Sequence, residues 1–109
     1  MVTFIPERGD VVWINFEPQK GREIQKTRPA VVLSPYKYNL KSGLALFVPI
    51  TSQIKGYPFE VMINFEQIKG AVLCDQARSM DWRIRIATKI LTLDKILINV
   101  ILSKLRLLL

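Results

Sequence analysis

Turn residues interrupt the chain at short intervals, and this spacing is the feature that most restricts the fold. Four of the polar segments that separate the apolar runs contain glycine, proline or asparagine. Short apolar runs bounded by turn residues are typical of β-strands, not of strands that alternate with helices. We expect strands at residues 10–16, 29–34, 44–50, 59–65, 70–77 and 85–92. The pattern predicts a mainly β domain built on one twisted, barrel-like sheet.

The C-terminal segment has a different period. Apolar residues recur at helical spacing from Leu93 to Leu108, and Thr92 or Asp94 can cap the first turn. We therefore expect a C-terminal helix packed on the sheet. Further apolar residues, such as Leu102 and Leu107, lie off the main stripe, so the helix needs cover on more than one side. The simplest cover is a second copy of the chain.

Length and charge restrict the class of protein. A chain of 109 residues is expected to form one domain, residues 1–109. The net charge is +7, and most of it lies in two cationic blocks, residues 20–41 and 83–106. Two such blocks favour a polyanionic partner, because neutralised phosphates release counterions. The charge alone is equally compatible with a solubilising surface.

No segment predicts export or membrane insertion. The N-terminus lacks the basic start and apolar stretch of a secretory signal. Residues 96–109 are too short for a membrane span and are interrupted by Asn99, Lys104 and Arg106. The single Cys74 cannot form an internal disulfide, which fits a reducing compartment. We expect a cytoplasmic protein that does not bind a membrane.

Missing residue types exclude several kinds of chemistry. The chain has no histidine and one cysteine, so it cannot build a zinc site or a Cys–His or Ser–His pair. It also lacks a phosphate-binding glycine loop and a tight cluster of acids for two metals. RNA cleavage by the 2′-hydroxyl needs neither a metal nor a protein nucleophile, only geometry, charge stabilisation and modest proton transfer. We expect no cofactor and no metal.

Three segments resemble a known family. They occur in order, and they are "RGDVVWINFEPQKGREIQKTRPAVVLSPYKYN", "VPITSQIKGYPFEV" and "CDQARSMDWRIRIATK". Together they resemble the MazF/PemK (Kid-like) family of toxin endoribonucleases, especially its MazF- and ChpB-type members. The resemblance implies an SH3-like barrel of the CcdB/Kid/PemK type. It also implies a homodimer that cleaves single-stranded mRNA at specific short sequences without a metal and so inhibits translation. The implied ends are a 2′,3′-cyclic phosphate and a 5′-hydroxyl.

The resemblance also implies a partner. An acidic antitoxin of the MazE/PemI type would hold the toxin inactive by covering its basic groove. Toxin and antitoxin would form a hetero-oligomer, for which binding to operator DNA is a further possibility.

Three residues match the family's catalytic positions. The catalytic arginine falls on Arg28, the catalytic threonine on Thr51 and a loop glutamate on Glu23. A guanidinium offers a planar set of donors to phosphate oxygens and holds its proton tightly, so charge stabilisation suits Arg28 better than proton transfer. Glu23 would accept the 2′-hydroxyl proton or orient Arg28. From the residues alone, Arg28 could be a solvated residue at a strand entry, Thr51 a turn hydroxyl and Glu23 half of an ion pair.

Further residues around these positions are expected to bind RNA. Cations, amides and hydroxyls can contact the backbone, and a loop ring such as Tyr57 can stack on a base. The candidates are Lys26, Thr27, Ser52, Gln53, Lys55, Tyr57, Gln76 and Arg78. Thr27 replaces a histidine found in some relatives, so the cleavage sequence stays open.

Two alternatives remain at this point. One is a toxin of the same barrel that resembles CcdB and poisons DNA gyrase through its apolar terminal helix. The other is an RNA-binding module without catalytic activity.

Overall fold

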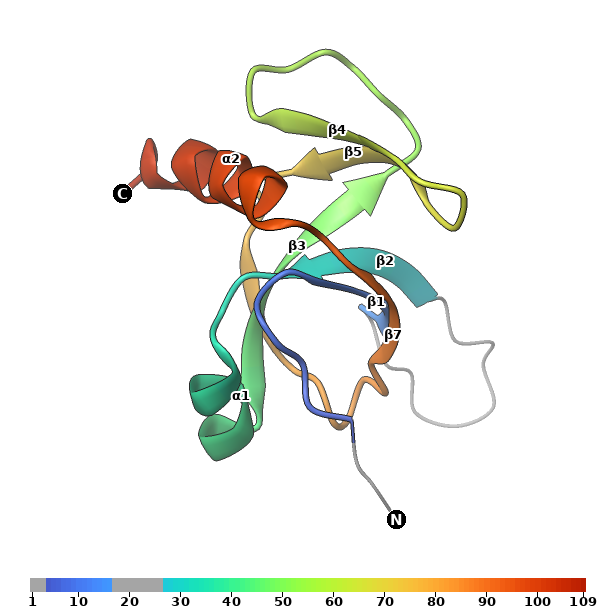
Figure 1. The fold of residues 1–109 in the computed structure, drawn as a ribbon. Coiled ribbons are helices and arrows are strands. Elements are labelled where there is room, and N and C mark those ends of the chain that lie inside the picture. The colour runs from blue at the N-terminus through green and yellow to red at the C-terminus, as the bar shows by residue number, and fades with distance from the viewer. Residues whose placement is uncertain (1–3, 17–26) are drawn as a thin grey trace.

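The computed structural model describes residues 4–16 and 27–109, and these form a curled sheet with two helices (Figure 1). The elements are β1 (Asp10–Asn15), β2 (Thr27–Val32), α1 (Tyr36–Ser42), β3 (Leu44–Thr51), β4 (Glu60–Asn64), β5 (Lys69–Leu73), β6 (Arg78–Asp81), β7 (Thr88–Thr92) and α2 (Lys95–Arg106). The prediction of a mainly β fold with a C-terminal helix is confirmed. Within the described ranges, no helix combines the length and the apolar character needed to cross a membrane.

The strands of the described part form one antiparallel sheet in the order β4–β5–β3–β2–β1–β7, with β6 also paired to β3. β3 is the strand on which the sheet turns. Its first residues pair with β6, its middle pairs with β2, and Ile50 and Thr51 pair with β5. The sheet therefore curls around β3 into a half-barrel, as the barrel-like prediction required (Figure 1).

Side chains alternate between the two faces of the sheet along each strand, and both faces are buried. One face packs against α2 in a cluster that includes Val11, Val31, Val48, Val72, Ile98 and Ile101. The other face lines the inside of the curl with Val12, Ile14, Ala30, Val32, Phe47 and Met80. The central strands are thus held on two sides, which makes them a rigid support for residues at their ends.

α2 begins where the sequence predicts a cap. The Asp94 side chain accepts a hydrogen bond from the Leu97 N–H at 2.9 Å, so it satisfies a donor that the helix itself leaves without a partner. Ile98 and Ile101 are buried in one cluster with Val61 and Ile63 of β4 and Val72 of β5. Ile96 and Val100, on the other side of the helix, and Leu107, which directly follows it, remain exposed.

The predicted strand over 70–77 is wrong in its second half. β5 ends at Leu73, and the Gln76 N–H donates to the Leu73 carbonyl at 3.1 Å, which turns the chain. A strand that was not predicted, β6, follows at Arg78–Asp81 and pairs with the start of β3. Met80 is its one buried residue, so the segment carries no apolar run that could have revealed it.

Two other expectations need correction. The polar segment 35–43, which separates the predicted strands 29–34 and 44–50, is not simply a connection but contains α1. This helix is held by a buried Asn39, whose side-chain amide donates to the Pro6 carbonyl at 2.7 Å. The predicted strand over 85–92 begins only at Thr88. Before it, the chain turns where the Asp81 carboxylate accepts from the Arg83 and Ile84 N–H groups. In both cases contacts made outside the apolar pattern decide the local structure.

Candidate functional site

The site lies where β2 and β3 separate. Their ladder ends at the pair Ala30 and Pro49, and β3 then pairs with β5 instead. Pro29 and Pro49 both stand at this point, and a proline has no N–H to extend a ladder. The two strands are antiparallel, so one step back along β2 corresponds to one step forward along β3. If the register continued two steps beyond Ala30 and Pro49, Arg28 would lie opposite Thr51. The two residues therefore flank an opening in the sheet.

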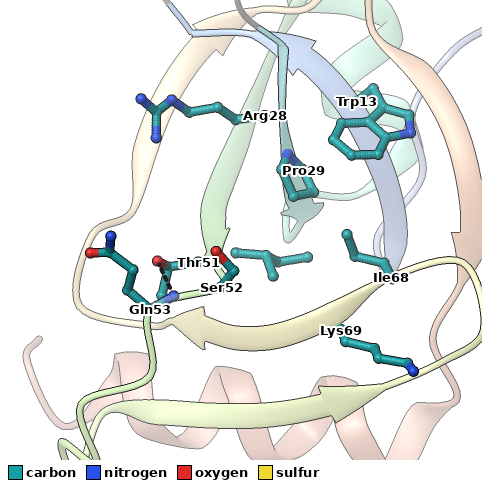
Figure 2. A pocket seen from close by; sticks show the side chains of 9 residues that line it. Trp13, Arg28, Pro29, Thr51, Ser52, Gln53, Ile68 and Lys69 are labelled. Atoms are coloured by element: carbon teal, nitrogen blue, oxygen red, sulfur yellow. Dashed lines mark hydrogen bonds between the residues drawn. The ribbon is translucent and has the colours of Figure 1, made fainter.

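Arg28 is part of β2 rather than of the preceding loop. It pairs with Ile14 of β1, so its backbone is fixed by a strand whose next four residues pack into the core or stand at its edge. Its side chain is exposed, and Figure 2 shows it extending away from Trp13, on the side of the pocket where Thr51 and Gln53 lie. A long cationic side chain on a rigid strand can present its donors at a defined place.

Thr51 ends β3 with an oriented hydroxyl. Its Oγ1 accepts a hydrogen bond from the Gln53 N–H at 3.1 Å, drawn as the dashed line in Figure 2. This local turn uses the oxygen as acceptor and leaves the hydroxyl proton available to donate. The side chain can thus offer one hydrogen bond to a ligand oxygen without losing its own support.

Three adjoining pockets meet at Thr51. The Trp13 pocket has a volume of about 410 Å³, and its lining residues are Trp13, Arg28, Pro29, Ile50, Thr51, Ser52, Gln53, Ile68 and Lys69. The Arg78 pocket, about 370 Å³, is lined by Phe16, Arg28, Pro49, Ile50, Thr51, Leu73, Gln76 and Arg78. The Tyr57 pocket, about 140 Å³, is lined by Thr51, Gln53, Lys55, Tyr57, Glu60, Leu73, Asp75 and Gln76. Arg28 and Thr51 belong to both larger pockets.

The structure brings together most of the residues that the sequence singled out. Eight predicted site residues line at least one pocket, although they come from three separate segments of the chain. They are Arg28, Thr51, Ser52, Gln53, Lys55, Tyr57, Gln76 and Arg78. Thr27 begins β2, is exposed and lines none of the three. Glu23 and Lys26 lie outside the described residues, so their predicted roles are not examined by the structure.

Sequence reasoning missed several residues of the site, among them the acids Glu60 and Asp75 of the Tyr57 pocket. Trp13 and Lys69 line the Trp13 pocket, and Phe16 lines the Arg78 pocket, where the Arg78 guanidinium lies 5.7 Å from the centre of its ring. Trp13 could have been suspected, because a large ring in a strand that leads into a basic segment is a possible stacking platform. Nothing in the sequence around Lys69 distinguishes it from other surface lysines.

The charge of the pockets is uneven. Among their described lining residues, the Trp13 and Arg78 pockets hold cations and no carboxylate. The Tyr57 pocket has two acids, Glu60 and Asp75, beside Lys55. An anionic group such as a phosphate is therefore favoured in the two larger pockets, whereas the smaller one can accept hydrogen bonds from a ligand.

Two side chains from outside the loop of residues 52–59 hold that loop in place. The Glu60 carboxylate accepts from the Gly56 N–H at 2.9 Å and from the Lys55 N–H at 3.2 and 3.3 Å. Lys104 of α2 donates to the Pro58 carbonyl at 2.5 Å. The loop is exposed along most of its length, yet its conformation is tied to β4 and α2.

Nucleophilic and metal chemistry have little support in the described residues. Cys74 is fully buried, and burial raises the pKa of its thiol to about 11. The thiol is therefore protonated at neutral pH and is a core residue, not a nucleophile. In the described ranges, no three side chains of His, Cys, Asp or Glu lie close enough to hold a metal ion.

Comparisons with known proteins identify the family of this chain. The sequence model of the family described as "PemK-like, MazF-like toxin of type II toxin-antitoxin system" matches residues 7–109. The chain belongs to this PemK/MazF family. Among its relatives is the endoribonuclease toxin MazF of Escherichia coli (strain K12), 51% identical over 86 residues, which are 79% of this chain and 78% of the relative. The endoribonuclease toxin ChpB of the same organism is 37% identical over 90 residues, 77% of each chain.

A solved member of the PemK/MazF family has the same fold over almost the whole chain. The crystal structure of MazE–MazF (Form-III) from Deinococcus radiodurans superposes with a TM-score of 0.87 at 42% identity and covers 96% of both chains. The family resemblance inferred from the three motifs is therefore confirmed. These relatives are named endoribonucleases or MazF, and no finding supports the gyrase-binding alternative.

Proposed function

We propose that this MazF-like toxin endoribonuclease cleaves single-stranded mRNA by attack of the 2′-hydroxyl on the adjacent phosphate. The 2′-oxygen forms a bond to phosphorus, the bond to the 5′-oxygen breaks, and that oxygen takes up a proton. The products are a 2′,3′-cyclic phosphate and a 5′-hydroxyl end, and loss of mRNA inhibits translation. Specific short sequences are cut, without a metal or cofactor.

The observation that carries the proposal is the shared position of Arg28 and Thr51 in two pockets whose described lining is cationic. A phosphate between them would receive charged donors from the guanidinium and one hydrogen bond from the hydroxyl. Both side chains extend from paired strands, so their backbone positions are set and their donors can be directed at the charge that develops on the phosphorane. The reaction needs this positioning more than it needs a strong acid or base.

The proton of the 2′-hydroxyl needs an acceptor. Glu23, from the family pattern, either takes this proton or orients Arg28. Ser52, Gln53, Lys55, Tyr57, Gln76 and Arg78 bind the neighbouring nucleotides, together with Lys26 and Thr27. The Tyr57 pocket suits a base, since its ring can stack and its acids can accept from exocyclic amino groups.

The proposed assembly follows the family. The toxin is a homodimer in the cytoplasm, and a cognate acidic antitoxin covers the cationic pockets and prevents RNA from entering. The solved MazE–MazF complex of Deinococcus radiodurans supports an antitoxin partner for this chain. Binding of the toxin–antitoxin complex to operator DNA is part of the same proposal.

The reaction type is tested with purified protein and mixed-sequence RNA in EDTA. Sequencing of the RNA ends locates a cleaved site, which is then placed in a short RNA. One 2′-deoxy substitution at the nucleotide that supplies the nucleophile should abolish cleavage. The same substitution two nucleotides away is the control and should leave cleavage within about 3-fold, because it leaves the attacking hydroxyl in place.

The ends identify the outcome. Cyclic phosphate and 5′-hydroxyl ends support the proposal. Cleavage that persists with the 2′-deoxy substitution, or that requires a divalent metal, contradicts it. RNA that stays uncut while gyrase is inhibited would favour the gyrase-binding alternative instead.

A further inference from the structure

The Trp13 pocket contains two residues that the proposed reaction does not use. Trp13 is the one exposed position of β1, whose other residues are buried, and 38% of its surface is accessible. It lies opposite Pro29 in the sheet, so its indole is next to the residue that follows Arg28. Figure 2 shows Pro29 between Arg28 and Trp13. An exposed ring at this place is a surface on which a base can stack.

Lys69 brings a second cation to the same pocket. It begins β5, two residues before Ala71, which pairs with Thr51. Its side chain is exposed and forms no ion pair within the described part of the chain. The pocket thus has Arg28 of β2 and Lys69 of β5 in its walls, together with the apolar surfaces of Ile68 and Trp13. Figure 2 shows Arg28 and Lys69 on opposite sides of the pocket, with Ile68 and Trp13 on the side away from Arg28.

This arrangement matches the repeat of a nucleic acid strand. Phosphates along one strand alternate with bases, and proteins bind single strands by combining cations for the phosphates with rings for the bases. The volume of about 410 Å³ lies within the range of roughly 300–1,000 Å³ that holds small organic ligands. Because no carboxylate is present among the described lining residues, a second phosphate would meet no repulsion from them.

We propose that Trp13 and Lys69 form a subsite for the nucleotide that flanks the cleaved linkage: its base stacks on Trp13 and its phosphate contacts Lys69. The subsite rests on the proposed function, because it takes the phosphate at Arg28 and Thr51 as the cleaved one. It extends the RNA path from the Arg78 pocket, across Arg28 and Thr51, to Lys69 at the start of β5.

Binding is measured first, with an RNA that carries the 2′-deoxy substitution and therefore stays intact. The chain has two tryptophans, and Trp82 is 5% exposed, so quenching by a stacked base would come from Trp13. The wild type should lose fluorescence on binding RNA, and Trp13→Phe should lose the quench but bind nearly as well. Trp13→Ala should weaken binding by about 5- to 100-fold, the effect of losing one stacked base.

Cleavage kinetics test Lys69. Lys69→Ala should raise KM with kcat within about 2-fold, because the residue binds a phosphate that does not react. The slope of log KM against log salt should fall by about 0.7, the value for one phosphate contact on a single strand. Lys37→Ala, on α1 and outside the three pockets, is the matched control and should change neither KM nor the slope.

The outcomes separate the subsite from the reaction. If RNA quenches Trp13 fluorescence and binds more weakly to Lys69→Ala while ordinary RNA stays uncut, that result would support the subsite and overturn the proposed function. Normal cleavage without a quench, with KM unchanged in Trp13→Ala and Lys69→Ala, would overturn the subsite and leave the reaction. Loss of antitoxin binding in these variants with RNA binding unchanged would assign the pair to a protein partner and also overturn it.

Discussion

The position of Thr51 depends on Gly70 of the neighbouring strand β5, because this residue has no side chain. A Cβ at Gly70 would lie 2.3 Å from the Thr51 carbonyl oxygen and 3.0 Å from its carbonyl carbon. Gly70 also has a φ of +153°, which side chains rarely adopt. Since both contacts are with backbone, a side chain here could be accommodated only if β5 or Thr51 moved.

Gly70→Ala is therefore expected to lower kcat by about 100-fold, the effect of a displacement of about 1 Å in a reactive group. The control is Gly43→Ala, which also has a positive φ, +73°, but whose added Cβ would meet the flexible end of the Arg83 side chain. It should lose stability with kcat kept within about 3-fold, because Gly43 lies outside the three pockets. Single-turnover cleavage and thermal unfolding measure the two effects. Equal kcat in both variants would show that Gly70 does not position Thr51.

The sequence revealed some of the site residues and not others. Arg28 and Thr51 were predicted because each belongs to a family motif that fixes residue types at set spacing. Trp13 and Lys69 were missed because their place depends on register: Trp13 faces Pro29, and Lys69 reaches the pocket only because β5 pairs with the end of β3. Register between distant strands has no local signal in an apolar run.

At the scale of elements, the loop of residues 52–59 is held by side chains of β4 and α2. Glu60 accepts hydrogen bonds from two consecutive backbone N–H groups, at Lys55 and Gly56. Charge strengthens these bonds, and a glutamine in its place would offer one oxygen and an amide group that repels the N–H. The loop carries Lys55 and Tyr57, so its order bears on RNA binding.

Glu60→Gln should raise KM by about 3- to 10-fold and leave kcat within about 3-fold, because the loop binds RNA while Arg28 and Thr51 stay in place. Hydrogen exchange at Lys55 and Gly56 should become faster. Glu66→Gln, an exposed acid beyond β4, is the control for the change of charge. A drop in kcat alone would contradict this role and make Glu60 part of the reacting site.

The elements that the sequence predicted well are those with strong apolar alternation or helical period, such as β1, β3 and α2. β6 and α1 were missed because their stability comes from distant contacts. β6 is defined by pairing with β3, and α1 is secured by Asn39, whose backbone carbonyl accepts from the Trp82 indole N–H at 3.1 Å. Local propensity is a weak guide where tertiary contacts decide.

For the whole molecule, the exposed side of α2 bears on assembly. Ile96 and Leu107 are 78% and 76% exposed, and Val100 lies between them on the side opposite the buried Ile98. An apolar stripe of this kind on a helix is expected to be covered. The proposed homodimer is the simplest cover.

We expect the chain to sediment as a dimer and Ile96→Glu/Val100→Glu to sediment as a monomer at the same concentration. Asn99→Glu, an exposed polar position on the same helix, is the control and should remain a dimer. Burying two carboxylates in an interface is far more costly than leaving them in water, which is the reason for the difference. A dimer that survives the double substitution would place the interface on another surface.

The central claim is that Arg28 and Thr51 stabilise the reacting phosphate. The most direct test is the single-turnover rate of RNA cleavage at saturating RNA for Arg28→Ala, with Thr51→Val beside it and circular dichroism to verify the fold. We predict a fall of about 10²–10³-fold for Arg28→Ala, the usual effect of removing one preorganised donor. Thr51→Val, which keeps the shape and removes the hydroxyl, should also fall. A wild-type rate in Arg28→Ala would contradict the account.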